Sequence, residues 1–278
     1  MNIHQLKEYV EVWNCEGYKP FILKNAIGRV LYKFKIPYKT IFGGMCGTGL
    51  LNYDEEAIKE ILKKSKGQIV IYDFQERDIL EKYGFKKYGD WTFVIDISNI
   101  EDLWKKIDKK NRNDIRYAEK SKVLFEEVES IEELNKLYFL FREQAKRWNF
   151  RIPSKDYFEN VWNNMVKNNM AKFFVAKYQK EIVSITQLFM FRDEISMPIW
   201  GNSEKANKIR GANNLLIWKI IEWSNKNNYK KFNMWGADPK QEGIFKFKES
   251  FGGLLVKVNR YEKAWWPYDI AKKLSAKQ

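Results

Sequence analysis

Two arginines stand four residues apart in a basic stretch, a spacing that suits phosphate binding. Arg112 and Arg116 share one face of a predicted helix with Lys109 and Lys120, because residues three and four apart are neighbours on a helix. A guanidinium group binds two phosphate oxygens at once, which an ammonium group cannot do. This basic stripe predicts contact with the phosphates of an activated precursor or of an RNA end. The alternative is a packed helix held by ion pairs such as Arg112 with Asp108.

The charge of the whole chain agrees with a polyanionic partner. The 278 residues carry a formal net charge of +14, from 50 Lys and Arg against 36 Asp and Glu. This excess favours nucleic acid, a phosphorylated ligand or an anionic membrane surface as partner. A general lysine bias that only solvates the surface is the alternative.

The scarcity of histidine and cysteine excludes some kinds of site. The single histidine, His4, stands near the N-terminus, and Cys15 and Cys46 have no CxxC spacing. Neither a histidine-based triad nor a typical zinc site can be assembled from these residues, so we expect no metal. No apolar run reaches the roughly 18 residues of a membrane-spanning helix, and Met1–Tyr9 lacks the core of a signal peptide. The expected location is the cytoplasm, with peripheral contact at the inner membrane face left open.

The order of predicted elements occurs twice along the chain. In the second half, a glycine turn, a helix, a strand, a short helix and a final strand follow three antiparallel strands at Phe173–Tyr178, Ile182–Phe191 and Ile195–Gly201. The first half repeats this order more weakly, with Gly43–Gly49 as its glycine-rich turn. The repetition predicts two like domains, residues 1–98 and 99–278, with a linker helix over 100–120 and a ligand cleft between the domains.

This order of elements resembles the GNAT acyltransferase fold. The resemblance implies an α+β (α/β) architecture of two tandem GNAT-like domains, with mixed, mostly antiparallel sheets flanked by helices. Substrate lies in a splayed opening between two central strands of this fold. Candidate substrate ligands therefore stand at the ends of those two strands: Trp200, Asn202, Asn233 and Trp235. Simple turn chemistry is the alternative for the asparagines.

Aromatic side chains near the expected opening could stack on a base or sugar. They are Tyr157, Trp200, Trp235, Trp265 and Trp266. Burial in a core or an interface is the alternative for each of them.

Two segments resemble one family more narrowly. Trp91–Ile97 with Asn111–Lys120, and the closing Gly243–Gly253, resemble the FemABX group of non-ribosomal peptidyltransferases. The resemblance implies transfer of an amino acid from aminoacyl-tRNA to an amine of a nucleotide- or lipid-linked muropeptide-like precursor, with no other cofactor. It also implies that Lys248 faces the cleft and contacts phosphate or developing negative charge. A surface lysine on a short helix is the alternative.

The residues are compatible with this reaction. Attack of an amine on an ester needs a neutral amine, a held carbonyl group and stabilisation of an oxyanion, but no side-chain nucleophile. Asp238 and Glu242 are the acids close to this segment that could relay a proton.

The glycine turn of the second half departs from the pattern that binds coenzyme A. A GNAT enzyme that uses acyl-CoA holds pyrophosphate on the backbone amides of an Arg/Gln-x-x-Gly-x-Gly/Ala loop. The corresponding segment here is Lys208-Ile209-Arg210-Gly211-Ala212-Asn213, with lysine first and asparagine last. The departure weakens the acyl-CoA interpretation and leaves Arg210 and Asn213 as candidate phosphate or substrate ligands.

We therefore predict an aminoacyltransferase that forms a peptide or isopeptide bond on a peptidoglycan-type or pseudopeptidoglycan-type precursor without the ribosome. The first alternative is an N-acyltransferase that uses acyl-CoA or an acyl-carrier protein on an amino sugar or amino acid. The second alternative is a basic RNA-binding protein that has lost the reaction.

Overall fold

The chain divides into two compact units. The computed structural model describes residues 6–16, 18–23, 26–33, 36–42, 54–63, 68–73 and 75–264. Unit 1 is Met1–Asp90 with Lys257–Gln278, and unit 2 is Trp91–Val256. The sequence predicted a division after residue 98 and a second domain that reaches the C-terminus. The division differs because two long strands, β5 (Lys86–Asp96) and β11 (Leu254–Ala264), each have residues in both units.

Unit 1 is a small sheet with short helices. Its strands β1 (Tyr18–Leu23), β2 (Ala26–Lys33) and β3 (Ile36–Phe42) pair antiparallel, β3 pairs parallel with β4 (Gln68–Asp73), and β4 pairs antiparallel with β11. Its helices are α1 (Lys7–Glu11), a 3-10 turn (Asn14–Glu16), α2 (Glu55–Lys63) and α3 (Asp78–Lys82). Ile58 and Ile61 of α2 pack with Ile71 and Tyr261 in its core, since an amphipathic helix buries one apolar face.

Unit 2 repeats this pairing with more complete elements. Strands β7 (Ala171–Tyr178), β8 (Glu181–Phe191) and β9 (Glu194–Asn202) pair antiparallel, β9 pairs parallel with β10 (Lys231–Gly236), and β10 pairs antiparallel with β5. Strand β6 (Leu124–Glu127) joins the free edge of β7. The shared order confirms the predicted repetition, and in each unit the strand beyond the parallel pair comes from the other half of the chain.

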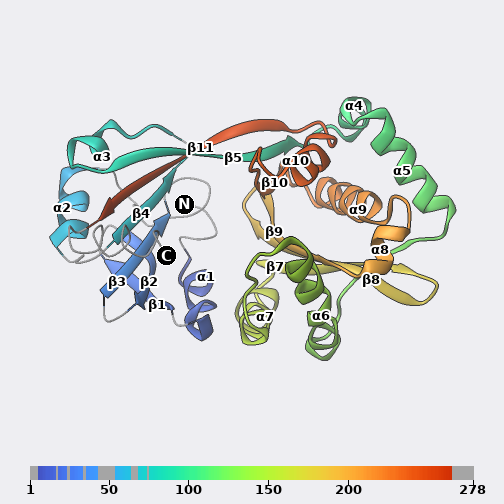
Figure 1. Cartoon of the computed structure of the whole chain (residues 1–278), viewed down its shortest axis with the longest axis horizontal. Coiled ribbons are helices and arrows are strands. Elements are labelled where there is room, and N and C mark those ends of the chain that lie inside the picture. The colour runs from blue at the N-terminus through green and yellow to red at the C-terminus, as the bar shows by residue number, and fades with distance from the viewer. Residues whose placement is uncertain are drawn as a thin grey trace. The chain divides into compact units, whose positions relative to one another are not determined.

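The helices of unit 2 cover both faces of its sheet (Figure 1). On one face lie α6 (Ile131–Trp148), α7 (Lys155–Val161) and a π turn (Trp162–Val166); on the other lie α5 (Lys109–Lys120) and α9 (Ala212–Lys226). The shorter helices are α4 (Ile100–Lys106), α8 (Glu204–Lys208) and α10 (Glu242–Glu249). Among the described residues, no helix is long and apolar enough to cross a membrane.

Local sequence signals account for several boundaries. Ser130 accepts a hydrogen bond from the backbone N–H of Glu133 at 3.1 Å, so the predicted capping box does begin α6. Gln179 and Lys180 have φ of 50° and 68°, the pair of positive values that a tight hairpin between β7 and β8 requires. Gly201 lets α6 cross β9 closely, because a Cβ atom there would lie 2.5 Å from the backbone nitrogen of Phe141.

The predicted linker helix over 100–120 is two helices. The buried residue Ile107 has extended backbone angles and ends α4, and α5 begins at Lys109. Arg112 stabilises this break, since its guanidinium group donates to the backbone carbonyls of Trp104 (3.3 Å), Lys105 (3.0 Å) and Ile107. A cation at a helix C-terminus satisfies carbonyls that have no partner within the helix.

Candidate active site

The two parallel central strands of unit 2 separate after a short paired segment. Lys231, Phe232 and Asn233 of β10 pair with Glu194, Ile195 and Ser196 of β9. Beyond this point β9 continues to Asn202 and β10 to Gly236 without pairing to one another. The strand ends form the splayed opening that the sequence predicted.

Lys248 of α10 is bound to the β10 side of this opening. Only 3% of the residue is exposed, and its Nζ donates to the carbonyls of Met234 (2.7 Å), Trp235 (3.1 Å) and Gly236 (2.6 Å). The Nζ also lies 5.4 Å from the ring centroid of Trp200 on β9. Burial lowers the pKa of Lys248 to about 7, whereas the three carbonyls favour the protonated form.

The backbone of β10 is shaped to receive this ammonium group. Carbonyls of a regular strand alternate in direction, but Trp235 has φ of 57° and interrupts the alternation. The side chain of Asn233 holds this distortion, because its Oδ1 accepts from the N–H of Trp235 at 2.9 Å and from Thr92 Oγ1 at 2.8 Å. Asn233 is 1% exposed and stabilises the strand end.

A pocket of about 230 Å³ lies in unit 2, between α6, β8, β9, α9 and α10. Its apolar wall consists of Trp148, Met197, Trp200, Leu216, Ile217, Ile244 and Phe247. Its polar groups belong to Gln144, Ser184, Thr186, Asn202, Asn207 and Asn213, and Gly243 completes the lining. None of these lining side chains is ionisable, so the pocket suits an uncharged ligand group.

A buried hydroxyl group organises the polar side of the pocket. Ser184 Oγ lies 2.5 Å from Asn202 Oδ1, 2.8 Å from Asn213 Oδ1 and 3.3 Å from the carbonyl of Gly201. Gln144 Oε1 accepts from Arg147 at 2.9 Å, and Arg147 also donates to the carbonyl of Asn202. The strand end of β9 is thus tied to α6 and α9.

The turn before α9 is packed against α5. Gly211 has φ of 76°, and a Cβ atom there would lie 2.0 Å from the carbonyl oxygen of Asp114. Arg210 Nε lies 2.7 Å from Asp114 Oδ1, and its guanidinium group lies 5.0 Å from the ring centroid of Tyr117. The left-handed glycine therefore serves the packing of α9 on α5, and Arg210 forms an ion pair with Asp114.

The segments that resembled a family connect α5 to α10. Asn111 is 3% exposed, and its Nδ2 donates to Ser250 Oγ at 2.8 Å and to the Ser250 carbonyl at 3.2 Å. Asn214 Nδ2 donates to Asn111 Oδ1 at 2.8 Å, which adds α9 to the same network. The amide of Asp108 donates to the Ser250 carbonyl at 3.0 Å. These residues hold the helices around the opening in position.

The structure brings three of the eleven candidate residues to the pocket: Trp200, Asn202 and Asn213. Lys248 contacts Trp200 from the strand side, and it is buried rather than on the surface. Tyr157 is 2% exposed and its hydroxyl accepts from Gln187 Nε2 at 3.3 Å, so it belongs to the core under α7. Asp238 is exposed in the turn after β10, where its Oδ1 accepts from the N–H of Lys240 at 2.9 Å.

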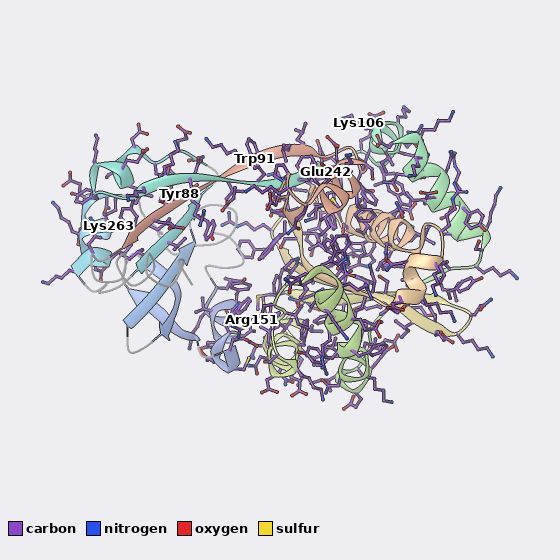
Figure 2. All side chains as sticks on the ribbon, in the orientation of Figure 1. Tyr88, Trp91, Lys106, Arg151, Glu242 and Lys263 are labelled. Atoms are coloured by element: carbon purple, nitrogen blue, oxygen red, sulfur yellow. The ribbon has the colours of Figure 1, made fainter. Side chains whose placement is uncertain are left out.

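The remaining candidates lie apart from the pocket lining. Trp235 is half-buried at the end of β10, and Arg116 is exposed with its guanidinium group 5.4 Å from the ring centroid of Trp104. Lys109 and Lys120 are exposed on α5. Lys106, which is labelled in Figure 2, is exposed on the neighbouring helix α4. Gly43–Gly49, Trp265 and Trp266 lie outside the described residues.

Six polar or aromatic lining residues were absent from the sequence prediction. They are Gln144, Trp148, Ser184, Thr186, Asn207 and Phe247. A signal existed for two of them, because Ser184 and Thr186 are polar residues at alternate positions of a mostly apolar strand. Within the described residues, no group of three or more His, Cys, Asp or Glu is placed to hold a metal ion.

The sequence matches a protein-family model. Residues 105–249, just over half of the chain, match the family described as acetyltransferase (GNAT) domain. The chain belongs to the GNAT acetyltransferase domain family. This GNAT protein is an acyltransferase, and its mixed α/β fold with a mostly antiparallel sheet agrees with that membership.

Solved structures share the fold over nearly the whole chain. The crystal structure of FemX aligns with a TM-score of 0.76 at 14% identity, and covers 98% of this chain and 94% of that one. The structure of L-PGS from Bacillus licheniformis aligns with a TM-score of 0.66 at 19% identity, with 93% and 92% covered. The C-terminal domain of a putative lysylphosphatidylglycerol synthetase from Agrobacterium fabrum gives 0.68 at 13%, with 94% and 89% covered. A search of curated proteins gives no match.

Proposed function

We propose that this protein transfers an aminoacyl group from aminoacyl-tRNA to an amine of a peptidoglycan-type precursor. The observation that carries the proposal is the position of Lys248, which lies in the opening between β9 and β10. The FemABX-like segments and the FemX-like fold support the same reaction class.

Lys248 occupies space that an acyl-CoA donor would need. In a GNAT enzyme that uses acyl-CoA, the donor enters the opening between the two parallel central strands. Here the Lys248 side chain bonds to three carbonyls at the edge of β10 and reaches the Trp200 ring on β9. A buried amino group with three hydrogen bonds is costly to displace, because its carbonyl partners would be left without donors.

The usual pyrophosphate site is also altered. Backbone amides at the start of the helix after β9 would cradle that group in a CoA-dependent enzyme. In this chain Ala212 is 1% exposed, its N–H already donates to the carbonyl of Ile209 at 3.2 Å, and Asp114 packs against Gly211. A carboxylate so near the turn repels a pyrophosphate, although Arg210 partly neutralises it.

An RNA donor fits the charge of the molecule. The net charge is +14, and α5 presents exposed Lys109, Lys110, Arg116 and Lys120 to solvent. Neutralisation of phosphates by such side chains supplies most of the sequence-independent affinity for nucleic acid. An acyl-CoA donor offers fewer phosphates and gains less from an extended basic surface.

The reaction needs little covalent chemistry from the protein. The acceptor amine attacks the ester carbon of the donor, the C–O bond to the ribose breaks, and the ribose hydroxyl takes up the proton that the amine loses. Lys248 contributes indirectly, since its N–H groups point to backbone carbonyls. It fixes the edge of the opening and supplies positive potential beside Trp200.

Single-turnover transfer tests the proposal. Purified protein is incubated with tRNA that carries radiolabelled amino acids and with a nucleotide-linked muropeptide, and the label should move to the muropeptide. Trp200→Ala should slow this transfer, whereas Leu254→Ala, an exposed residue (74%) outside the pocket, should not. Acetyl transfer from acetyl-CoA to an amine, with no label leaving the tRNA, would establish the acyl-CoA alternative instead.

A further inference from the structure

The pocket has the dimensions of one ring or one side chain. Its volume of about 230 Å³ is below the roughly 300–1,000 Å³ of pockets that enclose a whole drug-sized ligand. Two of its walls are tryptophans: Trp200 is half-buried, and Trp148, which is 50% exposed, also lines the pocket. Indole rings are effective stacking surfaces for nucleobases.

The Ser184 hydroxyl group has one hydrogen for two asparagine side chains. It can donate to Asn202 Oδ1 or to Asn213 Oδ1, which lie 2.5 Å and 2.8 Å away, but not to both. One of the two amides must therefore turn its nitrogen toward Ser184, because amide oxygen and nitrogen are interchangeable in such assignments. That amide then has a free carbonyl oxygen, and the other has a free NH2 group.

The pocket thus offers a neutral donor and a neutral acceptor close together. In the described part of the chain, the side-chain amides of Asn202 and Asn213 have no hydrogen-bond partner other than Ser184, and Gln144 Nε2 makes no hydrogen bond. A donor beside an acceptor complements the edge of adenine, which presents an amino group next to a ring nitrogen. Guanine presents two acceptors, N7 and O6, on the corresponding edge.

We propose that this pocket binds the terminal adenine base of the RNA donor, stacked on Trp148 and Trp200 and read by Asn202 and Asn213. The inference rests on the proposed function, because a tRNA carries its aminoacyl ester on the ribose of a terminal adenosine. The base adjoining the reacting ester would be anchored in unit 2, and the ester would lie at the pocket mouth. The aminoacyl side chain would not fill the pocket.

Uncharged RNA separates this inference from the transfer reaction. The probes are hexaribonucleotides of one sequence with a fluorescent 5′ label, ending in CCA, CCG or CCU, and binding is followed by anisotropy at constant salt. The CCA probe should bind more tightly than the CCG probe by about 5- to 150-fold, the effect of one bidentate base contact worth about 1–3 kcal/mol. Equal affinities for the three probes would overturn the inference, even if aminoacyl transfer occurs.

Two variants assign the effect to the pocket. Trp148→Ala should weaken CCA binding by about 5- to 150-fold through loss of stacking, whereas Phe150→Ala, an exposed aromatic residue (41%) outside the pocket lining, should leave it unchanged. Asn213→Ala should abolish the preference for adenine. The helix α9 should still fold in this variant, because CoA-binding loops have a small residue at the corresponding position. Retained discrimination between the CCA and CCG probes in Asn213→Ala would contradict the inference.

Discussion

At the scale of single residues, Lys248 is a buried and fully hydrogen-bonded side chain at the opening. The sequence implied a lysine that faces the cleft, with a surface position on a short helix as the alternative. It is 3% exposed and serves three backbone carbonyls. That outcome could not be read from the sequence, because the convergence of the carbonyls depends on the left-handed conformation of Trp235.

Loss of the Lys248 amino group should destabilise the fold. Lys248→Met should lower the free energy of unfolding by at least about 1–3 kcal/mol, since three buried carbonyls lose their donor. Lys246→Met is the matched control on the same helix, because its ion pair with Glu242 is exposed, and it should change stability by less than about 0.5 kcal/mol. Urea denaturation of both variants measures the difference, and equal midpoints would refute the assigned role.

The same residue predicts a pH dependence of stability. The pKa of Lys248 is lowered to about 7 in the folded protein by burial, against about 10.4 in an unfolded chain. Between these values the unfolded state binds more protons, so the free energy of unfolding rises with pH. The stability that follows from the lowered pKa of Lys248 is fully present above about pH 10.4. It is lost as the pH falls to about 7. Denaturation of wild type and Lys248→Met across this window should show the difference growing with pH; a constant difference would mean an ordinary lysine pKa.

At the scale of elements, periodicity and capping predicted most helices and strands. The capping box at Ser130 and the glycine turn at Gly211 were predicted in place, because their signals are local. The break between α4 and α5 was not predicted, because Arg112 caps α4 from the following helix and no local sequence signal marks that contact. Arg112 therefore stabilises the fold, and its charge reversal is an unsuitable test of phosphate binding.

The contact of α5 with α9 depends on Gly211. Gly211→Ala should lower the free energy of unfolding by at least about 1–3 kcal/mol, because φ of 76° strains an L-residue and the Cβ atom would meet the Asp114 carbonyl. Gly236→Ala is the control, since nothing lies within 4 Å of its Cβ position. Thermal unfolding of the two variants is the measurement. Similar melting temperatures would show that the turn can relax away from α5.

At the scale of the whole molecule, the repeated pairing order was predictable because both halves carry the same succession of elements. The pairing of β5 with β10 and of β11 with β4 was not predictable, since these strands lie at least 135 residues apart and such pairing leaves no periodic signal in the sequence. A neutral pocket within unit 2 was not predicted, although three of its lining residues were among the sequence candidates. Trp200, Asn202 and Asn213 stand at strand and helix ends, whereas Gln144 and Trp148 reach the pocket from α6.

The basic stripe predicts a salt dependence of tRNA binding. Each phosphate neutralised contributes about −0.7 to −0.9 to the slope of log affinity against log salt. Lys109→Glu with Lys120→Glu should make the slope shallower by roughly one to two units and weaken binding to every tRNA, since both residues are exposed on α5. Lys136→Glu with Lys226→Glu makes the same charge change at exposed positions on α6 and α9. If both pairs shift the slope equally, only net charge matters and the stripe has no special role.

The identity of the donor is the central claim, and calorimetric titration of wild-type protein with acetyl-CoA and with aminoacyl-tRNA tests it most directly. The ammonium group of Lys248 lies in the opening between β9 and β10, and Asp114 packs against the turn before α9. Saturable heat is therefore expected with aminoacyl-tRNA and none with acetyl-CoA up to millimolar concentration. Saturable binding of acetyl-CoA in the micromolar range, with no heat from aminoacyl-tRNA, would contradict the account.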